Sequence, residues 1–376
     1  MIQNRRLLNA VYILLAICPS SFVYASAVET PTIGTPSKIM GSPTEVTSEI
    51  FHTPAQILKF VNDSKLTYVF NLEKYVPLPA KPPQTLENGR IVIVTSDGRR
   101  TIKVFNEAYG SNPRYCKAFQ NAETHFNNHN YAEARQKYME VISIAEDQSQ
   151  VMGFIGQTLR IEKDYLNAEI WYRKALKINP ADFMAHWGLS TVLYLTNRKD
   201  LALRELIIAH ICNLNDSRIL GQLKTMSKEL GLEFQEWEFT PRFRISKVDN
   251  QTVNIDINSS DMDWLIYADA KALWQFEPHH KESILAASKR DPRTTEERYC
   301  LASLAMSAEN KSGETKKPII TKSIQELVNA IKLNRLDSYI AYEIFLREKP
   351  DAVLVWDSGA INAIADYLMA IRFKKL

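Results

Sequence analysis

Apolar positions with helical spacing and positions with strand-like alternation occupy different stretches of the chain. Polar and apolar residues alternate from 236 to 257 on both sides of Asp249-Asn250-Gln251, which predicts a β-hairpin. Apolar stripes with the spacing of one helix face predict later helices at 294–309, 318–334, 336–348 and 358–372. The C-terminal part is therefore expected to be an α+β, helix-rich unit. Its helices could extend a helical array, or its strands could pair with strands nearer the N-terminus.

The stretch 51–110 has a mixed pattern. It predicts a helix that begins at Pro54, a strand at 66–72, and a hairpin with strands 91–94 and 101–105. A unit of this size buries too little apolar surface to be stable alone. We therefore expect this small α/β unit to pack on its neighbour.

The strongest pattern is an internal repeat with a period of 34 residues. The frames are 115–148, 149–182 and 183–216. Similar residues recur at four positions of each frame: Ala122, Gly156 and Ser190; Ala134, Ala168 and Ala202; Tyr138, Tyr172 and Leu206; Val141, Ala175 and Ala209. Small residues allow two helices to cross closely, and large residues fill the gap beside them.

This pattern resembles the tetratricopeptide repeat (TPR), in which each unit is a pair of antiparallel helices. The outer frames depart from the family pattern, with Lys199 where an aromatic residue is usual and Leu214 where proline is usual. An apolar stripe at 220–230 predicts the capping helix that such arrays need. The resemblance implies a mainly α fold with a TPR-like α-solenoid of three repeats plus a capping helix. The alternative is an ordinary helical bundle with accidental spacing. The middle frame fits the family best, at Gly156, Tyr165, Ala168, Tyr172, Ala175 and Pro180.

The resemblance also implies that the first helix of each pair lines a concave groove. Amide, cationic and aromatic side chains there suit an extended peptide, whose backbone needs hydrogen-bond partners. The alternative for Trp187 and Tyr194 is packing against a neighbouring domain. The candidate groove residues are Asn127, Gln150, Gln157, Arg160, Trp187 and Tyr194.

A charged clamp for an acidic C-terminal tail is not expected in this groove. Repeats that bind chaperone tails hold the terminal carboxylate with lysine and asparagine. The corresponding positions here are Phe119 and Glu123 in the first frame, and Met184 and Gly188 in the third. The expected partner is therefore a different protein or peptide segment.

The charge balance excludes a strongly basic nucleic-acid binder. The chain has 46 Lys+Arg against 43 Asp+Glu, so it lacks the excess that a large phosphate footprint needs. No nucleotide-binding, nucleophile or zinc motif is present, and we expect no catalytic residue, no metal and no cofactor. The adjacent His279 and His280 would point apart, which makes them a poor metal pair.

The first residues resemble a secretory leader. Arg5 and Arg6 precede an apolar run at 7–18, and small residues follow at 25–27. The run is shorter than the roughly 20 residues of a membrane-spanning helix. We expect a signal peptide at 1–27, export to the periplasm or beyond, and no stable membrane span after cleavage. An uncleaved anchor is the alternative. The remaining cysteines, Cys116, Cys212 and Cys300, are expected to be buried thiols with at most one bridge.

The predicted organisation is a signal peptide at 1–27, a linker at 28–50, the small α/β unit at 51–110, the repeats with their cap at 112–230, and the C-terminal unit at 231–376. The repeats predict a noncatalytic protein–protein interaction module of the cell envelope or of a secreted assembly. One alternative is an enzyme, of hydrolase type, with its site in the C-terminal unit. Another is a structural homo-oligomer.

Overall fold

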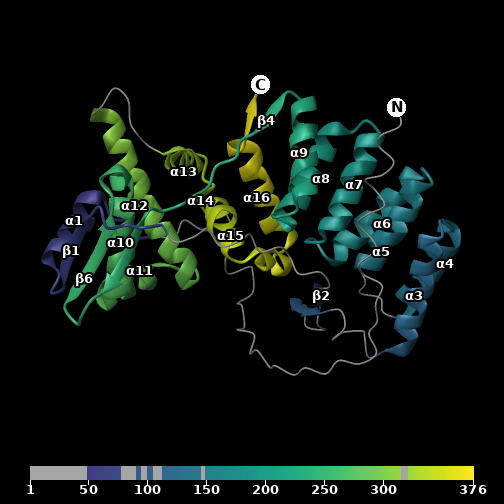
Figure 1. Ribbon diagram of the computed structural model, residues 1–376, viewed down its shortest axis with the longest axis horizontal. Coiled ribbons are helices and arrows are strands. Elements are labelled where there is room, and N and C mark those ends of the chain that lie inside the picture. Colours follow the sequence, from purple (N-terminus) through teal and green to yellow (C-terminus); the bar gives the residue numbers. More distant parts are fainter. Residues whose placement is uncertain (1–48, 78–89, 95–99, 105–111, 145–148, 315–320) are drawn as a thin grey trace. The chain divides into compact units, whose positions relative to one another are not determined.

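The computed structural model describes residues 49–77, 90–94, 100–104, 112–144, 149–314 and 321–376 (Figure 1). The chain is mainly helical, as predicted, with small sheets. Its contacts divide it into two compact units. The described part of the first unit lies within Leu86–Asn213, and that of the second within Gly34–Thr85 and Leu214–Leu376.

The first unit contains the repeats. In its described part, helices form three consecutive pairs: α3 (Pro113–Asn127) with α4 (Tyr131–Ile144), α5 (Ser149–Ile161) with α6 (Tyr165–Ile178), and α7 (Phe183–Leu195) with α8 (Lys199–Cys212). The second helices begin 34 residues apart, so the predicted period is confirmed. Strands β2 (Arg90–Val94) and β3 (Arg100–Val104) pair antiparallel, which confirms the hairpin predicted within the stretch 51–110.

The turn inside each helical pair has the same backbone conformation. His129, Lys163 and Asn197 have φ values of 63°, 67° and 62°, in the left-handed region. In each turn this amide donates to the carbonyl three residues earlier, at 3.0–3.1 Å. The repeat is therefore kept in the backbone even though these three side chains differ.

Tyr172 packs between two adjacent repeats. Its side chain is 3% exposed. A Cβ built on Gly156 would lie 3.0 Å from the Tyr172 ring, and one built on Gly188 would overlap that ring and lie 2.6 Å from its hydroxyl oxygen. The absence of a side chain at Gly188 on α7 therefore leaves the space that the tyrosine of α6 fills.

The Gly188→Ala substitution is expected to destabilise the first unit by about 2 kcal/mol, because the added methyl group forces a packed ring to move. This strain outweighs the gain of about 1 kcal/mol that alanine brings to a helix interior. Gly153 on α5 is the matched control, since a Cβ there meets nothing within 4 Å. Urea unfolding followed by circular dichroism should show Gly153→Ala equal to or above the parent and Gly188→Ala clearly below it. Equal stability of the two variants would contradict this packing.

The second unit is built on a three-stranded sheet. Strand β6 (Thr252–Ile257) lies between β1 (Thr67–Leu72), with which it is parallel, and β5 (Phe243–Lys247), with which it is antiparallel. The predicted hairpin at 236–257 is confirmed by the β5–β6 pair. The parallel pair answers the question that the sequence left open, because a strand from near the N-terminus completes the sheet.

One face of β6 forms the core with α10 (Leu265–Phe276). Val253 and Ile255 are fully buried and pack with Ala268 and Ala272 of this helix. Alternate residues of β6 are buried, as expected for a strand with one covered face. Helix α1 (Pro54–Asp63) also contacts α10, so residues 54–72 form part of this unit.

The remaining elements of the second unit follow the predicted helices closely. The π-helical stretch η3 continues α14 into α15, so 336–348 is helical throughout. Strands β4 (Leu232–Phe234) and β7 (Phe373–Lys375) pair antiparallel. The helical elements are α9 (Ser217–Glu229), η2 (Ser259–Trp264), α11 (Pro278–Ala287), α12 (Pro292–Glu314), α13 (Lys322–Lys332), α14 (Leu336–Tyr339), η3 (Ile340–Phe345), α15 (Leu346–Glu348), η4 (Pro350–Val355) and α16 (Ser358–Ile371).

The turn between α13 and α14 has the form of the repeat turns. Asn334 has a φ of 55°, and its amide donates to the Ile331 carbonyl at 2.9 Å. The Arg335 amide donates to the Ala330 carbonyl at 2.8 Å, as the Arg198 amide does to Leu193. The second unit therefore contains one helical hairpin with the same turn as the repeats.

The predicted domain boundaries stay predictions. Helix α9, expected to cap the repeats, is grouped with the second unit by its contacts. Cys212 and Cys300 are buried thiols, whereas Cys116, which also forms no disulfide, is only half-buried. In the part of the chain that the structure describes, no helix combines the length and apolar character needed to cross a membrane. The predicted leader and most of the linker lie outside the described residues.

Candidate functional site

The six residues predicted for the groove all lie on the first helices of the repeats. Asn127 is exposed, and the other five are half-buried, so none belongs to the fully buried core. They are Asn127 on α3, Gln150, Gln157 and Arg160 on α5, and Trp187 and Tyr194 on α7. Helices α5 and α7 contact each other directly.

Along each of these helices the residues are spaced for one face. On α5, Gly153, Gln157 and Arg160 are four and three residues apart, which brings them to the same side of the helix. Trp187 and Tyr194 on α7 are two helical turns apart in the same way. The space around Gly153 is open, because nothing lies within 4 Å of a Cβ built there. We call the surface formed by these helices the first-helix face. It comprises Gln150, Gly153, Gln157 and Arg160 of α5 with Trp187 and Tyr194 of α7.

Contacts within the chain hold several of these side chains in place. The Arg160 guanidinium donates a hydrogen bond to the Tyr172 hydroxyl. The Lys199 ammonium lies 5.4 Å from the centre of the Tyr194 ring, in cation–π geometry. Gln157, Trp187 and Tyr194 also have partners among the described residues. The first-helix face is thus ordered before any ligand binds, which lowers the entropic cost of binding.

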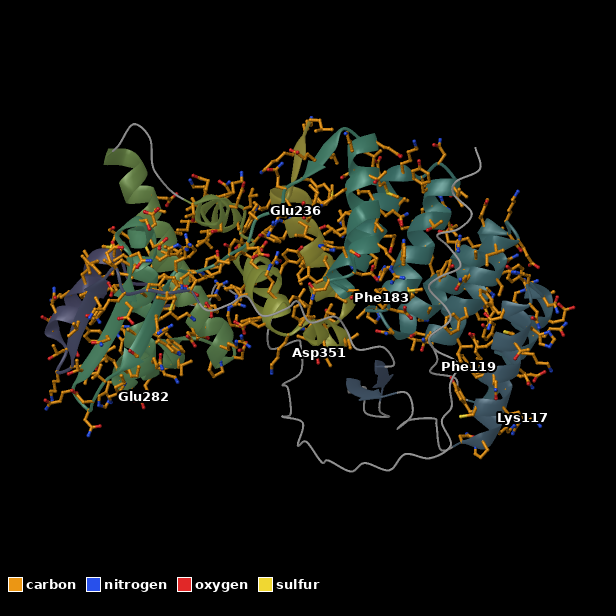
Figure 2. All side chains as sticks on the ribbon, in the orientation of Figure 1. Lys117, Phe119, Phe183, Glu236, Glu282 and Asp351 are labelled. Atoms are coloured by element: carbon orange, nitrogen blue, oxygen red, sulfur yellow. The ribbon has the colours of Figure 1, made fainter. Side chains whose placement is uncertain are left out.

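The first repeat differs from the arrangement that the family resemblance implies. The Phe119 ring, labelled in Figure 2, packs against the rings of Tyr115 and Phe154, with centroids 6.2 and 6.0 Å away. Glu123 is buried and accepts a hydrogen bond from the Tyr138 hydroxyl. Burial raises the pKa of this carboxyl group. Phe119 and Glu123 therefore take part in the packing of the first and second repeats.

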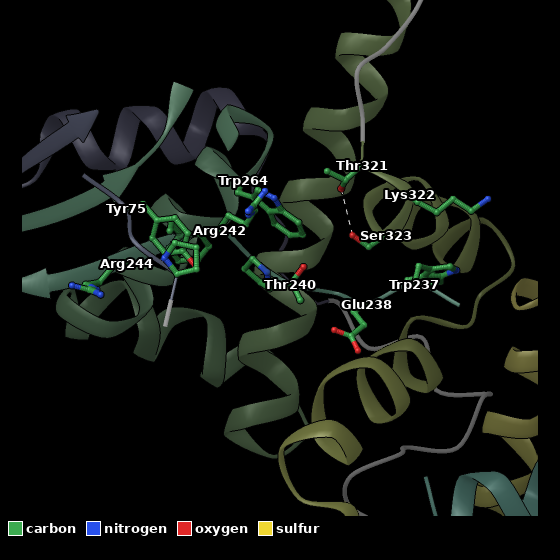
Figure 3. A pocket seen from close by; sticks show the side chains of 13 residues that line it. Tyr75, Trp237, Glu238, Thr240, Arg242, Arg244, Trp264, Thr321, Lys322 and Ser323 are labelled. Carbon is green, nitrogen blue, oxygen red and sulfur yellow. Dashed lines mark hydrogen bonds between the residues drawn. The ribbon is translucent and has the colours of Figure 1, made fainter. Parts of the chain in front are cut away.

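Sequence reasoning missed a pocket in the second unit, which has a volume of about 730 Å³ (Figure 3). Its walls come from four segments that are far apart in the sequence: 75–77, 237–244, Trp264 and 321–323. Single-segment motifs could not reveal it. The signal that was available is the density of aromatic and cationic residues between 237 and 244.

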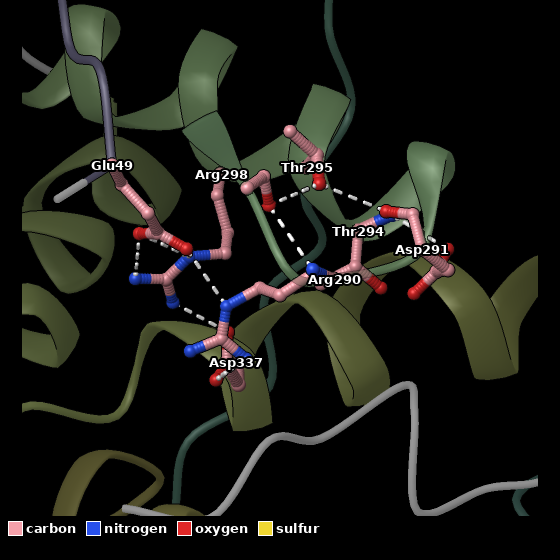
Figure 4. Close-up of polar contacts among 8 residues, drawn as sticks. Glu49, Arg290, Asp291, Thr294, Thr295, Arg298 and Asp337 are labelled. Carbon is pink, nitrogen blue, oxygen red and sulfur yellow. Dashed lines mark hydrogen bonds and ion pairs between the residues drawn. The ribbon is translucent and has the colours of Figure 1, made fainter. Parts of the chain in front are cut away.

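A half-buried network of two arginines and two carboxylates lies elsewhere in this unit (Figure 4). Glu49 accepts from Arg290 and Arg298, at 2.8 and 2.7 Å. Asp337 pairs with the same arginines, at 3.0 and 2.5 Å. Burial opposes the charge of Glu49, but the hydrogen bonds and charges of Arg298 and Arg290 hold the pKa of its carboxyl below the usual value. The two positive and two negative charges of this network balance one another. Its contacts join the segment before α1 to α12 and α14.

The two adjacent histidines do point apart. His279 is fully exposed, whereas His280 hydrogen-bonds to the Tyr299 hydroxyl at 2.8 Å. Burial lowers the pKa of His280 to about 4, so this imidazole is neutral at pH 7. Among the described residues, no group of three or more histidine, cysteine or acidic side chains is placed to hold a metal.

Comparison with known proteins assigns one of the helical pairs to a family. Residues 149–182 match the family model of the tetratricopeptide repeat. No curated protein matches the chain in sequence. These residues form the α5–α6 pair, the middle of the three pairs in the described part of the first unit.

Solved structures of repeat proteins resemble the chain at low sequence identity. The first TPR of Spaghetti (RPAP3) bound to an HSP90 peptide is 14% identical over 31% of this chain and 93% of that one, with a TM-score of 0.30. The TPR2B-domain:pHsp70 complex of yeast Sti1 is 17% identical over 31% and 98%, with a TM-score of 0.30. A tetratricopeptide repeat protein from Parabacteroides merdae is 11% identical over 68% and 99%, with a TM-score of 0.29. From the family-model match and the 34-residue helical pairs together, we conclude that this protein contains a tetratricopeptide repeat domain.

Proposed function

We propose that the repeats bind an extended segment of a protein or peptide on the first-helix face, and that the protein acts as a noncatalytic interaction module. The observation that carries this proposal is the combination of half-buried polar and aromatic side chains with the open space at Gly153. An extended chain needs such space because its backbone must approach the helix closely. It also needs polar neighbours for its amide and carbonyl groups.

The chemistry of the face divides between polar and apolar contacts. The amides of Gln150 and Gln157 can each donate to and accept from a peptide backbone. The Arg160 guanidinium has donors beyond the one that reaches Tyr172, and these suit a carbonyl or a carboxylate. Trp187 and Tyr194 offer rigid apolar surface with a polar edge, the residue types that most often dominate binding energy at interfaces.

The Trp187→Ala and Gln150→Ala variants are expected to weaken partner binding by tenfold or more and by a few-fold, respectively. A central aromatic anchor typically contributes about 2 kcal/mol or more, and each 1.4 kcal/mol is a factor of ten. Partners would be captured from an extract of the native host, and their affinities measured by calorimetry. The control is Leu166→Ala, because Leu166 lies on the second helix α6 and is 73% exposed.

The unfolding midpoint separates a binding effect from a folding effect. The proposal requires Gln150→Ala to keep the parent midpoint, whatever Trp187→Ala does to packing. Loss of affinity in Leu166→Ala equal to that in Gln150→Ala would move the interface off the first-helix face. Unchanged affinity in both groove variants would do the same.

We further propose that the protein works outside the cytoplasm, in the cell envelope or in a secreted assembly. The support is the order of charged, apolar and small residues at 1–27. The mature protein from the native host should begin after Ala25 or Ala27 when its N-terminus is sequenced by mass spectrometry. A mature chain that retains Arg5 and Arg6 would contradict cleavage.

A further inference from the structure

The pocket of the second unit is independent of the first-helix face. Its volume, about 730 Å³, lies within the range of small-molecule sites, roughly 300–1,000 Å³. Its lining comes from the end of the β1 segment, the extended residues before β5, Trp264, and the start of α13 (Figure 3).

Two indole N–H groups among the lining residues have no partner. Trp264 is 2% exposed, and its buried Nε1 atom makes no hydrogen bond in the structure. The Nε1 atom of Trp237 is also buried without a partner. An indole nitrogen can only donate, and an unpaired buried donor costs about 1–3 kcal/mol. Both nitrogens are closed to solvent, so these N–H groups serve as spectroscopic probes of the pocket walls and are not counted among its donors.

The start of α13 adds further donors. Thr321 is the N-cap residue of this 11-residue helix, and its side chain caps none of the first backbone amides. Those amides carry the positive end of the helix dipole, which attracts anions. The hydroxyls of Thr321 and Ser323 lie 3.4 Å apart and line the same pocket. The start of α13 therefore adds hydroxyl groups and the positive end of a helix dipole to the lining.

The charged side chains of the lining favour an anion. Arg242 is 54% exposed and reaches the Asp261 carboxylate at 3.5 Å, a loose ion pair. Arg244 donates to the Val76 carbonyl at 3.5 Å, the limit of a hydrogen bond. Lys322 is more firmly engaged, by Glu326 at 2.9 Å. The lining thus carries three cationic side chains against one acid, Glu238, which itself lies 3.5 Å from Arg347.

Flat rings form much of the remaining wall. Tyr75, Trp237 and Phe243 line the pocket with Trp264. The Arg372 guanidinium lies 3.5 Å from the centre of the Trp237 ring and so holds it in place. A simple inorganic anion would leave most of this volume and apolar surface unfilled. A planar apolar body fits the rings, because aromatic surfaces stack at low entropic cost.

We propose that this pocket binds a small organic anion, in which a carboxylate is attached to a flat, apolar body. The carboxylate accepts from the start of α13 and from Arg242, and the body lies among the rings. This is a second site, distinct from the peptide-binding face of the repeats, and either can fail without the other.

The test uses the full-length protein with 1-naphthaleneacetate as the probe, followed by calorimetry and by the indole N–H signals in nitrogen-15 NMR spectra. The neutral 1-naphthaleneacetamide and inorganic phosphate are the two matched comparisons. The sequence has six tryptophans, so the signals are few, and Trp264→Phe assigns one of them. The proposal expects saturable binding of the acid, with shifts of the Trp264 and Trp237 signals. Binding of the amide or of phosphate should be at least tenfold weaker, because charge-assisted hydrogen bonds are lost with the amide and ring contacts with phosphate.

Variants locate the binding. Arg242→Ala should weaken the acid about tenfold, whereas Arg218→Ala on α9, another partly exposed arginine of this unit, should leave affinity within twofold of the parent. The proposal is overturned by an acid that does not saturate at millimolar concentration. It is equally overturned by equal binding of acid and amide, by phosphate that binds as well as the acid, or by equal effects of the two arginine variants.

Discussion

The Glu343→Ala variant is expected to lose about 3–5 kcal/mol of the second unit's free energy of unfolding. The Glu343 and Arg372 side chains are 0% and 1% exposed and form an ion pair at 2.5 Å. Glu343 also accepts from the Tyr367 hydroxyl at 2.8 Å, and Arg372 donates to the Gln235 carbonyl at 2.9 Å. Removing the carboxylate would leave a buried guanidinium without its compensating charge.

The matched control is Glu348→Ala on α15, in the same helical segment. The Glu348 side chain is 55% exposed and pairs with Arg293 at the surface, so its loss should cost less than about 1 kcal/mol. Urea unfolding of both variants, followed by tryptophan fluorescence, measures the difference. Equal stabilities of the two variants would show that the Glu343–Arg372 pair is not buried as described. A Glu343→Leu/Arg372→Met double variant should recover much of the loss, because no unpaired charge remains.

The second large effect is a loss of stability as pH rises. Asp269 on α10 is 0% exposed, and neither oxygen of its carboxyl group has a hydrogen-bond partner. Burial raises the pKa of Asp269 to about 7. Between the ordinary pKa of about 4 and this value, the folded state holds a proton that the unfolded state has released. The contribution of Asp269 is therefore present below about pH 4 and falls by about 4 kcal/mol as pH rises through 7.

The Asp269→Asn variant tests this dependence, because an amide does not titrate. Its free energy of unfolding should match that of the parent at pH 4 and exceed it by several kcal/mol at pH 8. The difference between the two proteins isolates Asp269 from the other titrating groups. Asp63→Asn, at an exposed position of α1, is the control for the effect of the substitution itself. A constant offset between Asp269→Asn and the parent across this range would rule the mechanism out.

The repeats were predictable because each depends on local residues at a fixed spacing. Small residues such as Ala134, Ala168 and Ala202 are fully buried in the structure, as close helix crossings require. The left-handed turns gave no such signal, because histidine, lysine and asparagine occupy the same place in them. That conformation is imposed by the helical pair and not by one residue type.

The sheet of the second unit shows where pattern reasoning stops. The sequence pattern predicted a strand at 66–72 and a hairpin within 236–257, but it holds no information about which strands of the two regions pair. The parallel register that joins Thr67 to Thr252 spans 185 positions of sequence and depends on packing against α10. The pocket was hidden for the same reason, since its walls meet only after folding.

The candidate site was predicted in part. The repeat register put Gln150, Gln157 and Trp187 on first helices, and they are half-buried there. The register alone does not reveal that Phe119 and Glu123 also contact Tyr138 and Phe154. Binding by the first-helix face itself stays a prediction.

Site-specific photocrosslinking tests whether the partner binds on the first-helix face. A benzoylphenylalanine residue would replace Gly153, where the space is open, or Leu166 on α6, which is 73% exposed. The partner is expected to crosslink from position 153 and not from position 166, and excess unlabelled protein should abolish the product. Crosslinking from position 166 alone would contradict binding on the first-helix face.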